Sequence, residues 1–197
     1  MKTMLTALKN QAGIRPDAPA FVDPDETLTF ADVERISDAA GSALIGRGAK
    51  REAVLVFTAR SAREIALFFA VWKAGCFYVP VDAEMGENRI RSILDRVRPR
   101  FAIADETGRK LLNDYGFAGE ALDPDLLIAH APDADALRAV EAATLDVDPA
   151  YLVLAGAYAL VYVRVGLDEP RVRAAIDRWC DRQIPAFVKK LDEEGTY

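Results

Sequence analysis

The sequence predicts an α/β protein with a mainly parallel sheet and flanking helices. The continuous apolar run 53–57 is typical of a strand that is buried on both faces of such a sheet, and 101–104 is another short predicted strand. Segments with the i, i+3, i+4 spacing of amphipathic helices lie before and after these runs. Strands that alternate with helices are typical of βαβ units, in which successive strands are parallel.

The chain begins with a predicted helix and hairpin. Apolar residues on one side of 3–12 favour a weakly amphipathic helix. Prolines divide the next stretch into two extended pieces, 20–22 and 28–29, which we expect to pair as a hairpin. The pattern Thr29-x-x-Asp32 is typical of a capped helix N-terminus. The apolar stripe of that helix and the glycines that end it are Val33, Ile36, Ala40, Leu44, Gly46 and Gly48.

The stretch 61–82 predicts a buried helix that leads directly into a strand. Ser61-x-x-Glu64 can close a capping box at the helix N-terminus. Every residue of 65–72 is apolar, so we expect a helix without a polar face, buried rather than on the surface. The features that follow are a last-turn cation at Lys73, a left-handed residue at Gly75, and a strand over 76–79 that Pro80 ends.

The later elements are predicted from shorter signals. The stretch 87–97 has an apolar stripe at i, i+3, i+4 and i+7, and Pro99 stops this helix. No internal repeat or low-complexity segment interrupts the pattern. The further elements that we expect are helices over 108–115, 134–143 and 171–183 and strands over 126–129 and 158–165.

The composition is that of a globular protein. Of the 197 residues, 51% are hydrophobic and 28% are charged, and the net charge of −6 argues against a nucleic-acid partner. The two cysteines, Cys76 and Cys180, offer neither a disulfide framework nor metal-ligand spacing, which favours a reducing compartment. The run 65–72 is far too short to cross a bilayer, and no signal-peptide pattern is present. We therefore expect a cytoplasmic protein without a membrane partner.

Three segments resemble the motifs of one enzyme superfamily. The segment 72–82, WKAGCFYVPVD, resembles the "lKAGxaYVPlD" signature of the adenylate-forming, or AMP-binding, enzymes. Segments 16–33 and 87–99 resemble the "PdxxA…lTYxeL" and "pxeRixxil…P" motifs of the same superfamily. Its members include acyl-CoA synthetases, nonribosomal peptide synthetase adenylation domains and D-alanine–carrier-protein ligases. The resemblance extends over about residues 4–154 and includes no catalytic motif.

The resemblance divides the chain into two parts. Residues 1–154 resemble a partial N-terminal adenylation subdomain. Residues 155–197 form a predicted strand–helix tail, in which the run 184–188 weakly resembles part of the family's C-terminal lid subdomain. The tail has no counterpart of the lid's terminal catalytic lysine motif. The chain is therefore expected to be a truncated or internally deleted relative of these enzymes.

The phosphate-binding loop of the family is missing from the sequence. In the family, a strand that resembles 146–154 leads into a loop rich in Ser, Thr and Gly that ends in Lys and wraps the ATP phosphates. Here no Ser or Thr occurs between Leu145 and Gly195, where the lysines are Lys189 and Lys190. Triphosphate oxygens need such hydroxyl, amide and ammonium donors at close approach. We identify no catalytic, cofactor-binding or metal-binding residue and expect no cofactor for this chain alone, whereas the family uses ATP and Mg.

Other kinds of site are disfavoured. His130 is the single histidine and has no nucleophile beside it. The loop 58–61 lacks the glycines of a dinucleotide-binding turn. Five arginines form a local cluster that is interleaved with acids, as on a solvated helix face: Arg89, Arg91, Arg96, Arg98 and Arg100. Four aspartates lack the glycine and the terminal glutamate of a calcium-binding loop: Asp133, Asp135, Asp146 and Asp148.

Two functions follow from the sequence. The resemblance implies a partial adenylate-forming ligase, which activates an amino acid or other carboxylic acid with ATP for transfer to a carrier thiol and is inactive alone. The alternative is a non-catalytic binding or interaction module that keeps the α/β scaffold. The partners implied are a carrier protein, a second chain that supplies the missing site, or another copy bound through exposed apolar surface.

Overall fold

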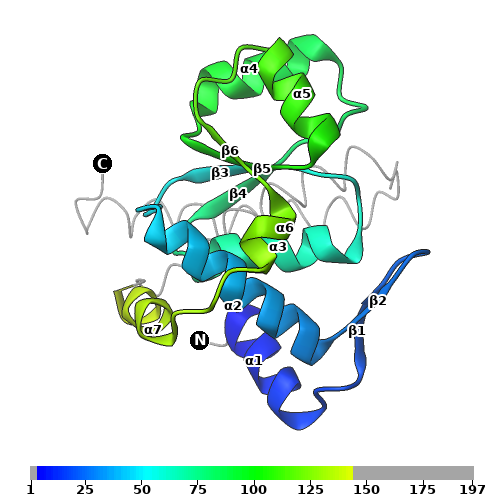
Figure 1. Ribbon diagram of the computed structural model, residues 1–197, viewed down its shortest axis with the longest axis vertical. Helices are drawn as coiled ribbons and strands as arrows, with labels where there is room; N and C mark the ends of the chain where they lie inside the picture. The colour runs from blue at the N-terminus through cyan, green and yellow to red at the C-terminus, as the bar shows by residue number, and fades with distance from the viewer. Residues whose placement is uncertain (1–3, 144–197) are drawn as a thin grey trace, which may run out of the picture. The chain divides into compact units, whose positions relative to one another are not determined.

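A parallel sheet of four strands in the order β4-β3-β5-β6 lies at the centre of residues 4–143, the part of the chain described by the computed structural model (Figure 1). In the central strand β3, Val54 lies opposite Tyr78 of β4 on one side and Phe101 of β5 on the other. The predicted α/β class with a mainly parallel sheet is therefore confirmed. The bounds of the strands are Ala53–Phe57 for β3, Phe77–Pro80 for β4, Phe101–Ala104 for β5 and Glu120–Leu122 for β6.

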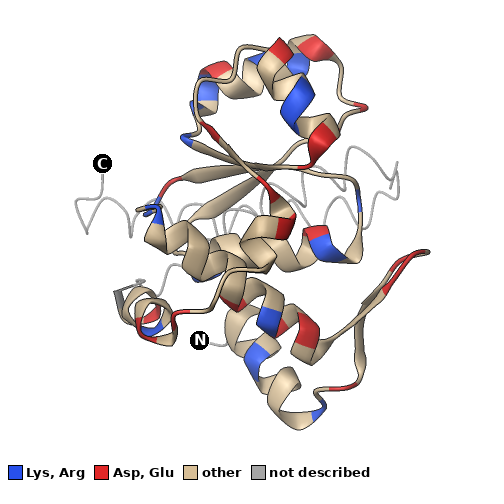
Figure 2. Ribbon diagram, in the orientation of Figure 1, with Lys and Arg blue, Asp and Glu red and all other residues tan. Residues whose placement is uncertain are grey.

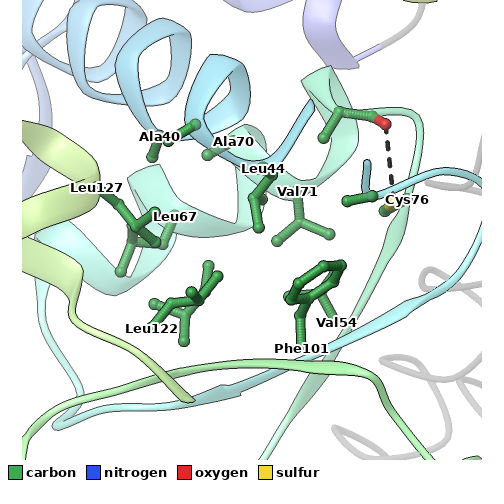
Figure 3. Packing of buried hydrophobic residues seen from close by; sticks show 14 of the residues in the cluster. Ala40, Leu44, Val54, Leu67, Ala70, Val71, Cys76, Phe101, Leu122 and Leu127 are labelled. Atoms are coloured by element: carbon green, nitrogen blue, oxygen red, sulfur yellow. Dashed lines mark hydrogen bonds between the residues drawn. The ribbon is translucent and has the colours of Figure 1, made fainter. Parts of the chain in front are cut away.

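Helices cover both faces of the sheet. Side chains alternate along each strand, so the apolar strands present apolar side chains on both faces. Val54 and Val56 of β3 point into a cluster with α2 (Phe30–Gly46), α3 (Ala62–Lys73) and α6 (Pro124–Ile128) (Figure 3). Leu55 and Phe57 point to the opposite face, where α4 (Glu87–Val97) and α5 (Glu106–Asp114) pack. All five residues of β3 are buried, as predicted for a strand covered on both faces.

A third apolar cluster lies on the side of α2 and α3 away from the sheet. It joins these helices to α1 (Met4–Ile14) and to the antiparallel hairpin of β1 (Pro19–Val22) and β2 (Thr27–Thr29). Leu8 is the buried residue of α1, which agrees with its weak amphipathic pattern. The last described helix, α7 (Ala134–Ala143), lies beside α2 and coincides with its predicted range (Figure 1).

The ends of α2 and α3 follow the predicted capping signals. Thr29 and Asp32 form a complete capping box at the start of α2. At the end of α3, Gly75 has φ of 69°, and its N–H donates to the Trp72 carbonyl at 2.9 Å. The N–H of Cys76 donates to the Val71 carbonyl at 3.1 Å, which completes a Schellman motif.

Two predictions about α3 need correction. The Ser61 side chain accepts from the Glu64 N–H at 3.2 Å, but the reciprocal bond of a capping box is not formed. The helix is also not buried on all sides, because Ile65, Phe68 and Trp72 are only partly buried. The apolar run 65–72 alone therefore did not reveal that one side of α3 is only partly buried.

The strand predicted over 126–129 is wrong, because these residues belong to the short helix α6 and the turn that ends it. Asp123 caps that helix by accepting from the N–H groups of Asp125 and Leu126, with Pro124 in its first turn. The strand at this edge of the sheet is instead β6, which was not predicted.

β4 ends at Pro80, as predicted, although the strand spans Phe77–Pro80 rather than 76–79. Among the described residues β4 is an edge strand, where the missing N–H of a proline is tolerated. The predicted elements over 146–154, 158–165 and 171–183 lie outside the described residues, as does the proposed boundary at 154/155. In the described part of the chain, every helix is too short or too polar to span a membrane.

Candidate functional site

The ends of three neighbouring strands bring charged side chains together at one edge of the sheet. The loop 58–61 follows β3, Asp82 follows β4 and Asp105 follows β5. Because the strands are parallel, their carboxyl ends lie at the same edge, which is where open α/β sheets bind ligands. We call Arg60, Glu64, Asp82 and Asp105 the strand-end cluster.

Arg60 is held by an acidic partner on the next strand. Its Nε lies 2.9 Å from Asp82 Oδ2, and its Nη2 contacts the same oxygen. Glu84 Oε2 is 3.6 Å from Nη2, so the guanidinium faces two carboxylates. The hydrogen bond to Asp82 raises the pKa of Arg60, which keeps it cationic. This ion pair joins the loop after β3 to the segment after β4.

Asp105 joins the same loop to the other neighbouring strand. Its Oδ1 accepts from the Gly108 N–H at 2.8 Å and so caps α5, while its Oδ2 accepts from the Ala59 N–H at 2.8 Å. Gly108 lies directly against the end of β3, since a Cβ added to it would be 2.2 Å from the Phe57 carbonyl oxygen. One carboxylate thus positions both a helix N-terminus and the loop 58–61.

Glu64, in the first turn of α3, has an altered pKa. Burial raises its pKa from 4.5 to about 7; Arg60 opposes this shift, and the carboxylates of Asp82 and Asp105 add to it. Burial, and to a lesser extent the charge of Glu64, raise the pKa of the Tyr78 phenol to about 12. Glu64 can therefore exchange a proton near neutral pH.

The cluster can hold a proton or a cationic group, but it does not fit a triphosphate. Three of its four members are acids, and its one arginine, Arg60, is already paired with Asp82. Phosphate oxygens brought to this edge would meet the carboxylates of Glu64, Asp82 and Asp105 at close range. Among residues 4–143, no group of three or more metal-ligating side chains is placed to hold an ion.

The residues singled out in the sequence do not join this cluster. His130 is exposed in the turn after α6. Arg89, Arg96 and Arg98 are exposed on or just after α4, a helix that carries both signs of charge (Figure 2). Arg91 donates to the Tyr115 and Asp114 carbonyls at the end of α5, and Arg100 pairs with Glu52. The arginines are therefore solvated or structural.

The other residues singled out in the sequence have structural roles wherever the structure describes them. Asp133 accepts from the N–H groups of Asp135 and Ala136 at the start of α7. Cys76 is fully buried, and its Sγ lies 3.6 Å from the Ala74 carbonyl oxygen, the contact drawn as a dashed line in Figure 3. Asp146, Asp148 and Cys180 lie outside the described residues.

Sequence reasoning did not identify the strand-end cluster. One signal was present, because a polar residue follows each apolar strand within two positions, at 58–61, Asp82 and Asp105. Only the parallel register of β4, β3 and β5 shows that these positions meet.

The described residues form a three-layer α/β domain with a parallel sheet and charged residues at the strand ends. The chain belongs to the AMP-binding enzyme family, whose sequence model matches residues 8–162. This match agrees with the motifs over 16–33, 72–82 and 87–99, so the resemblance to adenylate-forming enzymes is confirmed.

Peptide synthetases are among the similar proteins. Tyrocidine synthase 1 of Brevibacillus parabrevis is 27% identical over 122 residues, which are 61% of this chain and 11% of the synthase. The nonribosomal peptide synthetase agiA of Aspergillus flavus is 28% identical over 129 residues, 65% of this chain and 2% of the synthetase. The chain thus spans a small part of the synthetases that it matches.

Solved structures support the same fold. VinN in complex with L-aspartate has a TM-score of 0.59 and 26% identity, and the match covers 74% of this chain and 38% of VinN. O-succinylbenzoate coenzyme A synthetase (MenE) from Bacillus subtilis in complex with AMP has a TM-score of 0.56 and 19% identity. This match covers 64% of this chain and 33% of the synthetase. The second likeness concerns the fold alone.

Proposed function

We propose that the chain provides the first part of an amino-acid adenylation domain. In that role it contributes to the ATP-dependent activation of an amino acid, or of another carboxylic acid, to an acyl-adenylate that is transferred to a carrier thiol. The observation that carries this proposal is the family match over residues 8–162 together with relatives that are peptide synthetases. VinN, a structural neighbour solved with L-aspartate, favours an amino acid over other acids.

The 197-residue chain does not perform this activation alone under the proposal. The sequence after residue 154 provides no loop of Ser, Thr, Gly and Lys for the ATP phosphates. The strand-end cluster consists mainly of carboxylates, which repel a triphosphate rather than bind it. Residues 1–154 then act as a partial N-terminal adenylation subdomain and residues 155–197 as a separate tail. A carrier protein and a polypeptide that supplies the missing site are the partners that this role requires.

The test is ATP–pyrophosphate exchange by the purified chain with a panel of amino acids. A complete adenylation domain from a peptide synthetase is the positive control. We expect no exchange above background, and no heat of ATP·Mg binding in calorimetry at micromolar concentrations. Exchange with any amino acid, or micromolar ATP affinity, contradicts the requirement for a second polypeptide and reveals a phosphate site elsewhere in the chain.

A non-catalytic interaction module is the second candidate, and the surface of α3 favours it. Ile65, Phe68 and Trp72 are only partly buried, and Phe77 on the adjacent strand is 37% exposed. Such a module would bind a protein partner whether or not any acid is activated. Activity recovered on addition of a complementing polypeptide distinguishes the two roles, because only the first predicts that the complex carries out exchange.

A further inference from the structure

The loop 58–61 is tied to the segments that follow both neighbouring strands. The Ala59 N–H donates to Asp105 Oδ2 at 2.8 Å, and Arg60 Nε donates to Asp82 Oδ2 at 2.9 Å. Both contacts lie at the edge of the sheet where the parallel strands end. The position of this loop therefore depends on two carboxylates that belong to other elements.

Glu64 is the member of the strand-end cluster whose side chain is not paired. It is partly buried and makes no side-chain hydrogen bond or ion pair with the residues that the structure describes. A carboxyl group that is withdrawn from water and has no donor or cation beside it stays neutral. Burial accordingly raises the pKa of Glu64 to about 7. Above that pH the ionised group requires a counter-charge.

Arg60 is the cation within reach of Glu64. It immediately precedes the N-cap residue Ser61, whose Oγ accepts from the Glu64 N–H at 3.2 Å, so Arg60 and Glu64 extend from the same turn. The charges that act on Glu64 are those of Arg60, Asp82 and Asp105, of which Arg60 alone is positive. Tyr78 of β4 stays neutral here, because its pKa is raised to about 12.

The other charged residues at the start of α3 are already engaged with the hairpin. Asp23 Oδ2 accepts from the Ala62 N–H at 2.7 Å. Arg63 Nε donates to Glu26 at 2.9 Å, and its Nη1 lies 3.6 Å from a carboxylate oxygen of Asp125 on α6. Arg63 is therefore held away as a counter-charge for Glu64.

The pair of Arg60 with Asp82 is easily exchanged. The Arg60 side chain is 59% exposed, and ion pairs with an exposed partner contribute little to stability. Asp82 also accepts from the Glu84 N–H at 2.9 Å through Oδ1, so its charge does not depend on Arg60 alone. Ionised Glu64 has no such donor among the described residues and gains more from the guanidinium than Asp82 loses.

The loop also contains an unpaired hydroxyl group. Thr58 Oγ1 is buried and has no hydrogen-bond partner among the described residues. Buried polar atoms without a partner are rare and cost free energy. The loop is therefore not held by a full set of hydrogen bonds, which favours a second arrangement.

We propose that the loop 58–61 is a proton-controlled latch, in which Glu64 and Asp82 compete for Arg60. When Glu64 is protonated, Arg60 pairs with Asp82 and joins the loop to the segment after β4. When Glu64 ionises, Arg60 turns to Glu64 and no longer joins these two segments, while Asp105 keeps its bond to the Ala59 N–H. One edge of the sheet is thus tied more firmly at acid than at alkaline pH.

The test is NMR spectroscopy of the isotope-labelled 197-residue chain between about pH 5 and about pH 8, on both sides of the pKa of Glu64. Nuclear Overhauser effects from the Arg60 Cδ protons identify its partner through the Cβ protons of Asp82 or the Cγ protons of Glu64. We expect the Asp82 contact at the acidic end and its loss at the alkaline end, where a Glu64 contact replaces it. The Glu84 N–H should shift over the same range.

Two glutamine variants assign the change to Glu64. Glu64→Gln cannot ionise, so Arg60 should keep its contact with Asp82 over the whole pH range. Glu106→Gln is the matched control, because it removes an exposed carboxylate from the first turn of α5 and should leave the exchange of partners unchanged. Circular dichroism confirms that both variants are folded.

Two results would overturn the latch. Arg60 could fail to reach Glu64 at the alkaline end although the Glu64 carboxyl titrates, which would make Glu64 a local titrating group without a switch. The change of partner could also occur in Glu64→Gln, which would assign it to another titrating group.

Discussion

Lys73 Nζ lies 2.6 Å from Asp38 Oδ1 and 3.0 Å from Glu34 Oε2, so one cation on α3 neutralises two carboxylates on α2. The Lys73 side chain is only 10% exposed. Its position near the helix C-terminus was expected from the helix dipole, but the paired acids explain its burial more directly. This contact fixes the two helices that cover one face of the sheet.

Replacing Lys73 with Met should destabilise the fold by about 2–3 kcal/mol. The substitution leaves Glu34 and Asp38 without their cation in a partly buried position, and breaking a fully buried pair costs about 3–5 kcal/mol. The two acids keep some solvent contact, at 23% and 33% exposure, which reduces the cost. Urea unfolding followed by circular dichroism measures the change.

Arg35→Met is the matched control for that measurement. Arg35 and Asp32 form a pair at 3.5 Å on the surface of α2, with 61% and 37% of their side chains exposed. Pairs of this kind contribute below about 1 kcal/mol. If the Arg35 and Lys73 variants lose equal stability, the α2–α3 ion pair has no special role.

Gly108→Ala should destabilise the fold by about 3 kcal/mol or more. The added Cβ would lie 2.2 Å from the Phe57 carbonyl oxygen, so α5 would have to move away from the end of β3. Gly13→Ala is the control, since no atom lies within 4 Å of its added Cβ and alanine is favoured in the helix α1. A stable Gly108→Ala variant would show that α5 is not held against β3.

Phe69→Ala should cost about 3–5 kcal/mol, and Phe68→Ala only about 1–2 kcal/mol. Phe69 is 5% exposed and meets Trp72 edge to face at 5.3 Å, whereas Phe68 on the same helix is only partly buried. Urea unfolding of both variants measures the difference. Equal losses would mean that Phe68 is covered as fully as Phe69, contrary to the difference in their burial.

The sequence predicted most elements because their signals are local. The buried strand 53–57, the Thr29 cap and the Gly75 terminator each depend on residues within one short segment. β6 was missed because its three residues carry no apolar alternation and are a strand only beside β5. The strand predicted over 126–129 was wrong because the Asp123 cap outweighed a short apolar run.

The strand-end cluster could not be predicted for a different reason. Asp82 and Asp105 are separated from Arg60 by whole helices in the sequence. Their meeting follows from the strand order, which a single sequence does not specify. The altered pKa of Glu64 likewise depends on burial and on carboxylates from two other segments. The family motifs, by contrast, could be recognised because they are contiguous.

The stability of the chain should fall as pH rises from about 4.5 through about 7, in part because of Glu64. The folded state raises the Glu64 pKa from 4.5 to about 7, so in this window the folded chain holds a proton that the unfolded chain has released. Glu64→Gln cannot lose that proton and should gain stability relative to the unmodified chain at pH 8 but not at pH 4. Urea unfolding at several pH values measures this difference. Glu141→Gln, which removes an exposed carboxylate of α7, controls for the change in net charge. If the Glu64→Gln and unmodified chains show parallel pH profiles, Glu64 does not titrate in this window, and the strand-end cluster does not hold a proton near neutral pH.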